Sequence, residues 1–450
     1  MQRKQFLPSW IPTLLVVVAV FLLVLVASAR GVVNAYWYQV IELAALTAIS
    51  ALGLNLIYGF NGQFSLGHIG LYAIGAYGSA LITKDFITPW SGSQVGALSW
   101  MAAGQVGVVV ALLVISQLRI GSVRERLNTQ LRGALRPYES GVIITLVVLV
   151  LAAVGLGVGA AVAWGLRQVL LAAFNAALTG LPAPLGQGIV FFLGLLLGGT
   201  LAALVAYLIG LALLRLGSDY FGIATLGFSV MIYTALQNSD LVIATMKGAR
   251  GMVGIPNWTT WPWAFGALVI TVIIMRNLVH SSYGRAIMSV REDEIAAKTM
   301  GVDVTRLKTL AFTFGGFFAG VAGGLYAHLF GFLHPSTFNF IKGFDPLIII
   351  VFGGLGSITG TIVGSGIFAL LIEGLRVLLP QGFEDWRFVI YPVILLLVML
   401  LRQRGLLGST EWGWLRAPLP PARDIPVPAR AMPQEAQAAS GNEEESLHAR

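Results

Sequence analysis

The stretch from residue 281 to residue 308 holds the side chains best suited to binding another protein. They are an acidic triplet, two alanines and a glycine: Glu292, Asp293, Glu294, Ala296, Ala297 and Gly301. Residues 291 to 300 contain strong helix formers and no proline, and Gly301 supplies the flexible end that follows a helix. The pattern predicts a short helix in water. It is either a solvated connector or a docking element that offers the small faces of Ala296 and Ala297 to a groove on a partner.

A second group of polar side chains interrupts an apolar stretch nearer the N-terminus. It lies among glycines and comprises Asn55, Asn61, Gln63, Ser65 and His68. Because unsatisfied polar groups are costly in lipid, this stretch should face protein or a water-filled cavity. Two interpretations stay open. The side chains cap helices at a short turn, or they form part of a translocation path with a broken helix around residues 61–67.

The residue types that catalytic and metal sites need are scarce in this chain. It has no cysteine, which excludes disulfides, thiolate metal sites and cysteine nucleophiles. Its five histidines lack the spacing of a zinc site. No Walker A sequence occurs, and the glycine-rich run at 353–357 lacks the Lys and Ser or Thr that a phosphate loop needs. We therefore expect a protein that is not an enzyme and that holds no cofactor of its own.

The composition is that of a membrane protein. The chain is 57% hydrophobic and 11% charged, against about 25% charged residues in soluble proteins. Its net charge of +8 does not indicate nucleic-acid binding, because the basic residues gather on one side of the predicted spans, as the positive-inside rule expects. By the same rule both termini are predicted to be cytoplasmic.

The apolar segments predict an all-α polytopic fold. We expect about ten membrane-spanning helices and, in addition, an inserted two-helix hairpin that carries the basic loop 119–136. The tail is rich in proline and poor in apolar residues, so we predict that it is disordered. The predicted parts are a tail with the first helix (1–34), a membrane domain (35–402) that contains the hairpin (97–164), and a cytoplasmic tail (403–450).

Glycines predict where helices pack closely and where one must break. Gly316, Gly320 and Gly324 lie four residues apart on one helix face, which suits close helix packing. The run 344–379 would be ~54 Å long as one helix, too long for a hydrocarbon core of about 30 Å. We expect it to break at Gly353, Gly354 and Gly356 into two antiparallel pieces, each crossing the membrane.

Two stretches carry a resemblance to a known family. GRAIMSVREDEIAAKTMG, at 284–301, resembles the permeases of branched-chain amino-acid ABC importers, and it holds a pattern similar to their EAA loop with one extra residue, Ile295. The run 53–80 resembles the same family's signature. The resemblance implies that residues 281–308 are the coupling loop of a permease subunit in the cell inner membrane.

The resemblance also implies partners. They are a second related permease subunit, a cytoplasmic ABC ATPase dimer that holds ATP and Mg, an extracytoplasmic substrate-binding protein and the lipid bilayer. The expected cargo is a branched-chain or other hydrophobic amino acid, and urea or short amides are the alternative. An ion-coupled secondary transporter or channel is a further alternative, but it needs acids in mid-membrane, for which only Glu42, Asp345 and Glu373 are candidates.

Overall fold

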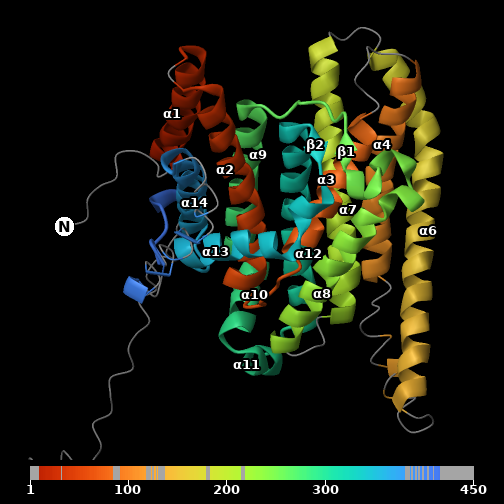
Figure 1. Ribbon diagram of the computed structural model, residues 1–450. Helices are drawn as coiled ribbons and strands as arrows, with labels where there is room; N and C mark the ends of the chain where they lie inside the picture. The colour runs from red at the N-terminus through yellow and green to blue at the C-terminus, as the bar shows by residue number, and fades with distance from the viewer. Residues whose placement is uncertain are drawn as a thin grey trace, which may run out of the picture. The chain divides into compact units, whose positions relative to one another are not determined.

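A computed structural model gives the arrangement of the helices (Figure 1). It describes residues 10–31, 33–84, 92–117, 137–178, 183–213, 218–380, 405–408 and 410–415, with scattered positions within 123–129 and 386–402. Most of the predicted basic loop 119–136, half of the positions in 386–401 and the chain after residue 415 lie outside the described residues.

Helices make up nearly all of the described secondary structure. The long helices are α1 (Trp10–Ala29), α2 (Ala35–Leu54), α3 (His68–Thr83), α4 (Gly92–Gln117), α6 (Pro137–Leu178), α7 (Ala183–Leu213), α8 (Ser218–Gln237), α9 (Trp261–His280), α12 (Val304–Phe330) and α14 (Ile358–Leu378). The short helices are η1 (Asn55–Phe60), η3 (Ser239–Leu241), η4 (Ala244–Met246), η5 (Gly248–Arg250), α10 (Ser282–Glu292), α11 (Glu294–Thr299), η6 (Pro335–Phe338), η7 (Phe340–Gly343), α13 (Phe344–Gly353) and η9 (Gly413–Leu415). Two strands, β1 (Met252–Val253) and β2 (Phe332–Leu333), pair antiparallel.

The chain is an all-α polytopic membrane protein, as its composition predicts. Within the described part, seven helical segments are long and apolar enough to cross a membrane, and residues 17–28 and 102–115 form shorter apolar helices. The segment α10–α11 lies at one end of the bundle, and the β1–β2 pair lies at the opposite end (Figure 1). Each end therefore presents different elements to the water on its side of the membrane.

Helix α12 is the central helix, and it packs against α7, α3 and α2. Small residues allow these close approaches, because a Cβ on Gly320 would lie 2.6 Å from Ala202 Cβ and 2.7 Å from Gly198 O. A Cβ on Gly316 would lie 2.6 Å from Ala206 Cβ. A Cβ on Gly324 would lie 2.9 Å from Leu195 Cδ2. All three predicted packing glycines thus face α7, and Gly316 and Gly320 lie too close to its backbone and alanines for a larger side chain.

Two helical stretches are interrupted, one between η1 and α3 and one between α13 and α14. The segment 61–67 is not helical, and α3 begins only at His68. Helix α13 has ten residues, about 15 Å, so the expectation that it crosses the membrane by itself is wrong. A Cβ on Gly343, just before α13, would lie 3.2 Å from Ile69 Cγ2. The first turns of α3 and α13 therefore lie side by side inside the bundle.

Helices α4 and α6 pack against each other as the predicted hairpin. A Cβ on Gly107 would lie 2.6 Å from Gly159 O, so the two backbones are in close contact. Helix α6 has 42 residues, about 63 Å, and forms one edge of the bundle (Figure 1). It continues to Leu178, so the helix runs 14 residues beyond the predicted end of the hairpin at residue 164.

Candidate coupling site

The segment 281–308 forms two short helices rather than one. Helix α10 ends at Glu292 and α11 begins at Glu294, with Asp293 between them in an extended conformation (φ −156°, ψ 110°). Its Oδ1 accepts hydrogen bonds from Ile295 N (2.8 Å) and Ala296 N (2.9 Å). Asp293 is therefore the N-cap of α11, and this explains why the expected continuous helix over 291–300 is interrupted.

Helix α11 ends where the sequence predicts. Gly301 has φ +85°, its N–H donates to Lys298 O and the next N–H, of Val302, donates to Ala297 O, both at 3.1 Å. This pair of bonds is a Schellman motif, which favours glycine at the left-handed position. Asp303 then caps α12 by accepting from Arg306 N at 3.0 Å. The Schellman motif at the end of α11 and the Asp303 cap at the start of α12 thus fix the turn between these two helices.

The outward face of α11 differs from the prediction. Ala296 is exposed, but Ala297 is only 6% exposed and packs inward, so the expectation that both alanines face a partner is wrong for Ala297. The most exposed apolar side chains of the segment 281–308 are Ile295 (78%) and Met300 (84%). The surface that α11 offers is therefore more apolar than the sequence pattern indicates.

Two charged side chains tie the segment to the bundle. Lys308 Nζ of α12 lies 2.6 Å from Glu294 Oε2 of α11. Arg291 of α10 donates through Nη1 to Gly59 O in η1, the π-helical continuation of α2. Sequence reasoning singled out the neighbouring acids but missed Arg291, because its acceptor is a backbone carbonyl 232 positions away.

Asn55 joins η1 to the break between α13 and α14. Its side chain is fully buried, and its Oδ1 accepts from Gly356 N at 2.9 Å. Its Nδ2 donates to Ser357 O and to Thr361 Oγ1, both at 3.0 Å. The break itself uses Gly354 (φ +126°) and Gly356 (φ +78°). One amide thus holds the helix break against the π-helical turn that Arg291 contacts, and π-helical turns are frequent at functional sites.

The break also has close backbone contacts that exclude side chains. A Cβ on Gly353 would contact the backbone carbonyl of Gly360, which brings the end of α13 against the start of α14. A Cβ on Gly356 would lie 2.8 Å from Arg291 Nη1. The helix break, η1 and α10 therefore meet within side-chain contact of Arg291.

The chain after the last predicted span is ordered where it meets this break. Glu411 accepts from Ile358 N (2.6 Å) and Thr359 N (3.1 Å), and so caps α14 from outside. Leu406 N donates to Phe352 O at 2.8 Å. The prediction of disorder from residue 403 onward is therefore wrong for 405–408 and 410–415. The sequence carries no local signal for this contact, since the acceptor and the helix are about 50 residues apart.

The five polar residues predicted for a path separate into three places. Asn55 is at the helix break. Ser65 and His68 are buried at the start of α3, where Ser65 Oγ accepts from Gly67 N (3.4 Å) and His68 Nε2 lies 2.8 Å from Ser50 O. Asn61 and Gln63 lie beside the segment 281–308 and line a pocket there.

Comparison with known proteins identifies the family. Residues 140–400, more than half of the chain, match the family described as branched-chain amino acid transport system, permease component. The chain belongs to this family. The match starts within α6, so it includes one helix of the hairpin that we expected to be an insertion.

Curated relatives of the permease have the same description. It is 29% identical over 258 residues to the high-affinity branched-chain amino acid transport system permease protein LivM of Salmonella typhimurium, covering 50% of this chain and 59% of that protein. It is 27% identical over 179 residues to LivH of the same organism, covering 39% and 55%. It is 30% identical over 148 residues to BraD of Pseudomonas aeruginosa, covering 32% and 47%. The chain thus spans about half the length of these relatives, and no solved structure matches it.

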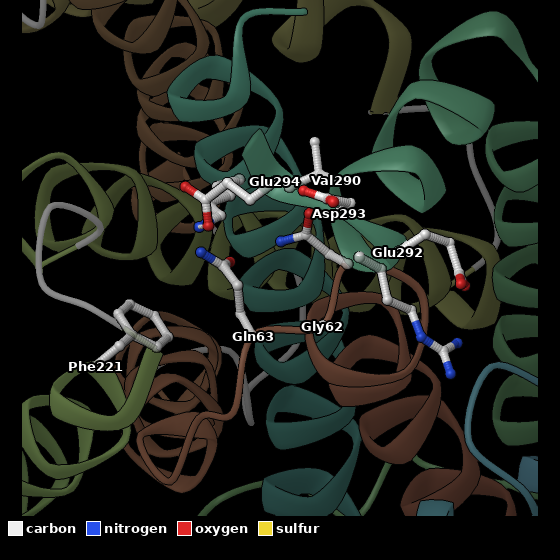
Figure 2. A pocket seen from close by; sticks show the side chains of 10 residues that line it. Gly62, Gln63, Phe221, Val290, Glu292, Asp293 and Glu294 are labelled. Carbon is white, nitrogen blue, oxygen red and sulfur yellow. Dashed lines mark hydrogen bonds and ion pairs between the residues drawn. The ribbon is translucent and has the colours of Figure 1, made fainter. Parts of the chain in front are cut away.

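The pocket of the permease lies between the α2–α3 link and the segment 281–308. Its volume is about 210 Å³, and it is lined by Asn61, Gly62, Gln63, Phe221, Val290, Arg291, Glu292, Asp293, Glu294 and Lys308. Figure 2 shows Gln63 extending toward Glu294, with Phe221 at the side of the pocket and Glu292 directed away from Gln63. Among the described residues no group of three or more His, Asp or Glu side chains is placed to hold a metal ion. The chemistry of this site is therefore that of amides, charged side chains and one aromatic wall.

Proposed function

We propose that this permease is the membrane subunit of an ATP-driven importer of branched-chain or other hydrophobic amino acids. The observation that carries the proposal is the exposed α10–α11 segment, which Arg291 and Lys308 connect to α2 and α12. A helix with exposed Ile295 and Met300 suits a groove on a partner, as in helix-in-groove recognition. The named cargo of the LivM, LivH and BraD relatives supports the amino-acid assignment.

In this proposal the α10–α11 end faces the cytoplasm and binds an ABC ATPase dimer, which supplies ATP and Mg. The chain pairs with a second, related permease in the cell inner membrane, and an extracytoplasmic binding protein delivers the amino acid. The opposite end, with β1 and β2, then faces the binding protein. Both termini lie in the cytoplasm.

Movement of the ATPase would reach the membrane through the contacts described above. Displacing α10 moves the Arg291 guanidinium, which holds Gly59 O of η1. The η1 turn is joined through Asn55 to the break between α13 and α14. The two ATPase states therefore shift the permease between conformations only if they differ in their contacts with α10–α11.

The docking step is tested by capture from native membranes. The tagged permease is purified in mild detergent, and the recovered proteins are identified by mass spectrometry. We expect a P-loop ATPase and a second permease with the unmodified chain. Ile295→Asp should lose the ATPase and keep the second permease, because it places a charge on the apolar docking face. The matched control is Leu241→Asp, an 83% exposed leucine at the opposite end, which should keep the ATPase. ATPase recovery unaffected by Ile295→Asp would refute the docking assignment.

The cargo is tested by uptake into proteoliposomes that contain the recovered complex and its binding protein. ATP-dependent uptake of radiolabelled L-leucine is the expected result. Uptake of urea in place of leucine would move the permease to the short-amide class. Leucine uptake driven by an ion gradient without ATP would replace the proposal with the secondary-transporter alternative.

A further inference from the structure

The pocket beneath α10–α11 contains buried amides without partners. Asn61 is 2% exposed and Gln63 is 6% exposed. Neither Asn61 Oδ1, Asn61 Nδ2 nor Gln63 Oε1 has a hydrogen-bond partner among the described residues. Because buried polar groups are nearly always paired, these three atoms indicate that the pocket holds something when the permease is in its membrane.

The unpaired atoms limit what the occupant can be. Two of them are acceptors that need a donor, and one is a donor group that needs an acceptor. A simple cation leaves the Asn61 amide donor unpaired. A simple anion leaves both acceptors unpaired and also meets the carboxylates of Asp293 and Glu294. The occupant must therefore carry both donors and an acceptor.

The remaining walls of the pocket add charge and an apolar surface. Lys308, whose Nζ lies 2.6 Å from Glu294 Oε2, has further N–H donors for a carboxylate, and the carboxylates of Asp293 and Glu294 can pair with an ammonium group. Phe221 and Val290, which are 2% and 4% exposed, form the apolar wall. The volume of about 210 Å³ corresponds to roughly seven water molecules at about 30 Å³ each, which suits a small metabolite and is too small for a nucleotide.

We infer that this pocket is a binding site for a free α-amino acid with an apolar side chain. Its ammonium group donates to Gln63 Oε1 and Asn61 Oδ1 beside the acidic residues. Its carboxylate accepts from Asn61 Nδ2 and Lys308, and its side chain lies against Phe221. The site lies between the α2–α3 link and α10–α11 (Figure 2).

Binding at this site has a consequence for transport. A bound amino acid joins Asn61 and Gln63 of the α2–α3 link to the acidic turn of the segment 281–308. It therefore stabilises the present arrangement of these elements against any other. This inference rests on the proposed function, in which this end is cytoplasmic and the cargo is an amino acid. The imported amino acid can then bind here and favour one conformation of the permease.

Direct binding to the full chain in lipid nanodiscs tests the inference. Radiolabelled L-leucine is measured by equilibrium dialysis up to about 10 mM, which would nearly saturate a site with a Kd of 1 mM. We expect one saturable site per chain. Two leucine analogues serve as competitors: 3-methylbutylamine lacks the carboxylate, and 4-methylpentanoate lacks the ammonium group. Each should compete at least tenfold more weakly than leucine.

Variants place the site. Gln63→Leu removes the buried acceptor at similar volume and should weaken leucine binding at least tenfold. Glu294→Gln tests the same site at an exposed rim position and should weaken leucine binding several-fold. Because the Glu294 side chain does not contribute to the core, this variant remains informative if Gln63→Leu does not fold. Ser239→Ala, which removes a buried hydroxyl outside the pocket, is the matched control and should leave binding unchanged.

Three results would overturn the inference. Without saturable leucine binding, the pocket holds water only. Equal competition by 3-methylbutylamine means a cation site. Leucine binding that neither Gln63→Leu nor Glu294→Gln weakens means that the amino acid binds elsewhere. These results are distinct from failure of the proposed function, which is the absence of ATP-dependent uptake by the complex.

Discussion

Replacing Asn55 by leucine should strongly destabilise the permease, because the Asn55 amide makes three hydrogen bonds at the helix break. The change leaves Gly356 N–H without its acceptor in a half-buried place, which costs about 1–3 kcal/mol. It also removes two bonds from Asn55 Nδ2, each contributing about 0.5–1.5 kcal/mol. Ser357 O still accepts from Thr361 Oγ1 at 2.8 Å, so it is not left unpaired. We therefore expect a loss of about 2–6 kcal/mol in the free energy of unfolding.

The assay is equilibrium unfolding in mixed micelles, followed by the fluorescence of the 11 tryptophans. The control is Asn34→Leu, which removes an exposed cap where Asn34 Oδ1 accepts from Trp37 N at 2.9 Å and should cost about 1 kcal/mol. Leucine has the same branching and the same number of side-chain heavy atoms as asparagine and is not smaller, so a cavity does not explain a large effect at Asn55. If Asn55→Leu costs no more than Asn34→Leu, the amide does not hold the helix break in the way described.

Two further predictions concern the packing and the capping of single helices. Gly320→Val should lower the free energy of unfolding by about 1–3 kcal/mol, because its Cβ would meet Ala202, whereas Gly366→Val has open space and should cost less than half as much. Equal losses in the two variants would mean that α12 and α7 separate freely. Glu411→Gln removes the charge that caps α14 and should increase the rate of hydrogen exchange at Ile358 N–H several-fold. An unchanged rate at that amide would show that the cap does not protect it.

The contacts around Arg291 suggest why this region of the permease has so many glycines. Gly59 provides the carbonyl that accepts from Arg291, and Gly62 and Gly356 lie against the Arg291 side chain. A Cβ on Gly62 would lie 3.2 Å from Arg291 Cγ, and one on Gly356 would lie 2.8 Å from Arg291 Nη1. The glycines therefore leave room for the guanidinium between the backbone of η1 and the helix break.

The sequence by itself determined the features that depend on local composition. Apolar length predicts the membrane helices, and the run 344–379 is too long to remain one helix, so a break at its glycines follows. Gly301 ends α11 because a left-handed position favours glycine, whatever surrounds it. The pattern around Glu294 also indicated the family to which the chain belongs.

Only the tertiary structure decided which side chains meet. Ala296 and Ala297 are the same residue type, but α11 packs on the bundle with Ala297 inward. Arg291, Asn55 and Glu411 act on backbone atoms that are distant in the sequence, and a backbone acceptor carries no side-chain pattern to read. Residues 405–408 and 410–415 were predicted to be disordered because they were grouped with the proline-rich tail, and they are ordered because the helix break supplies their hydrogen-bond partners.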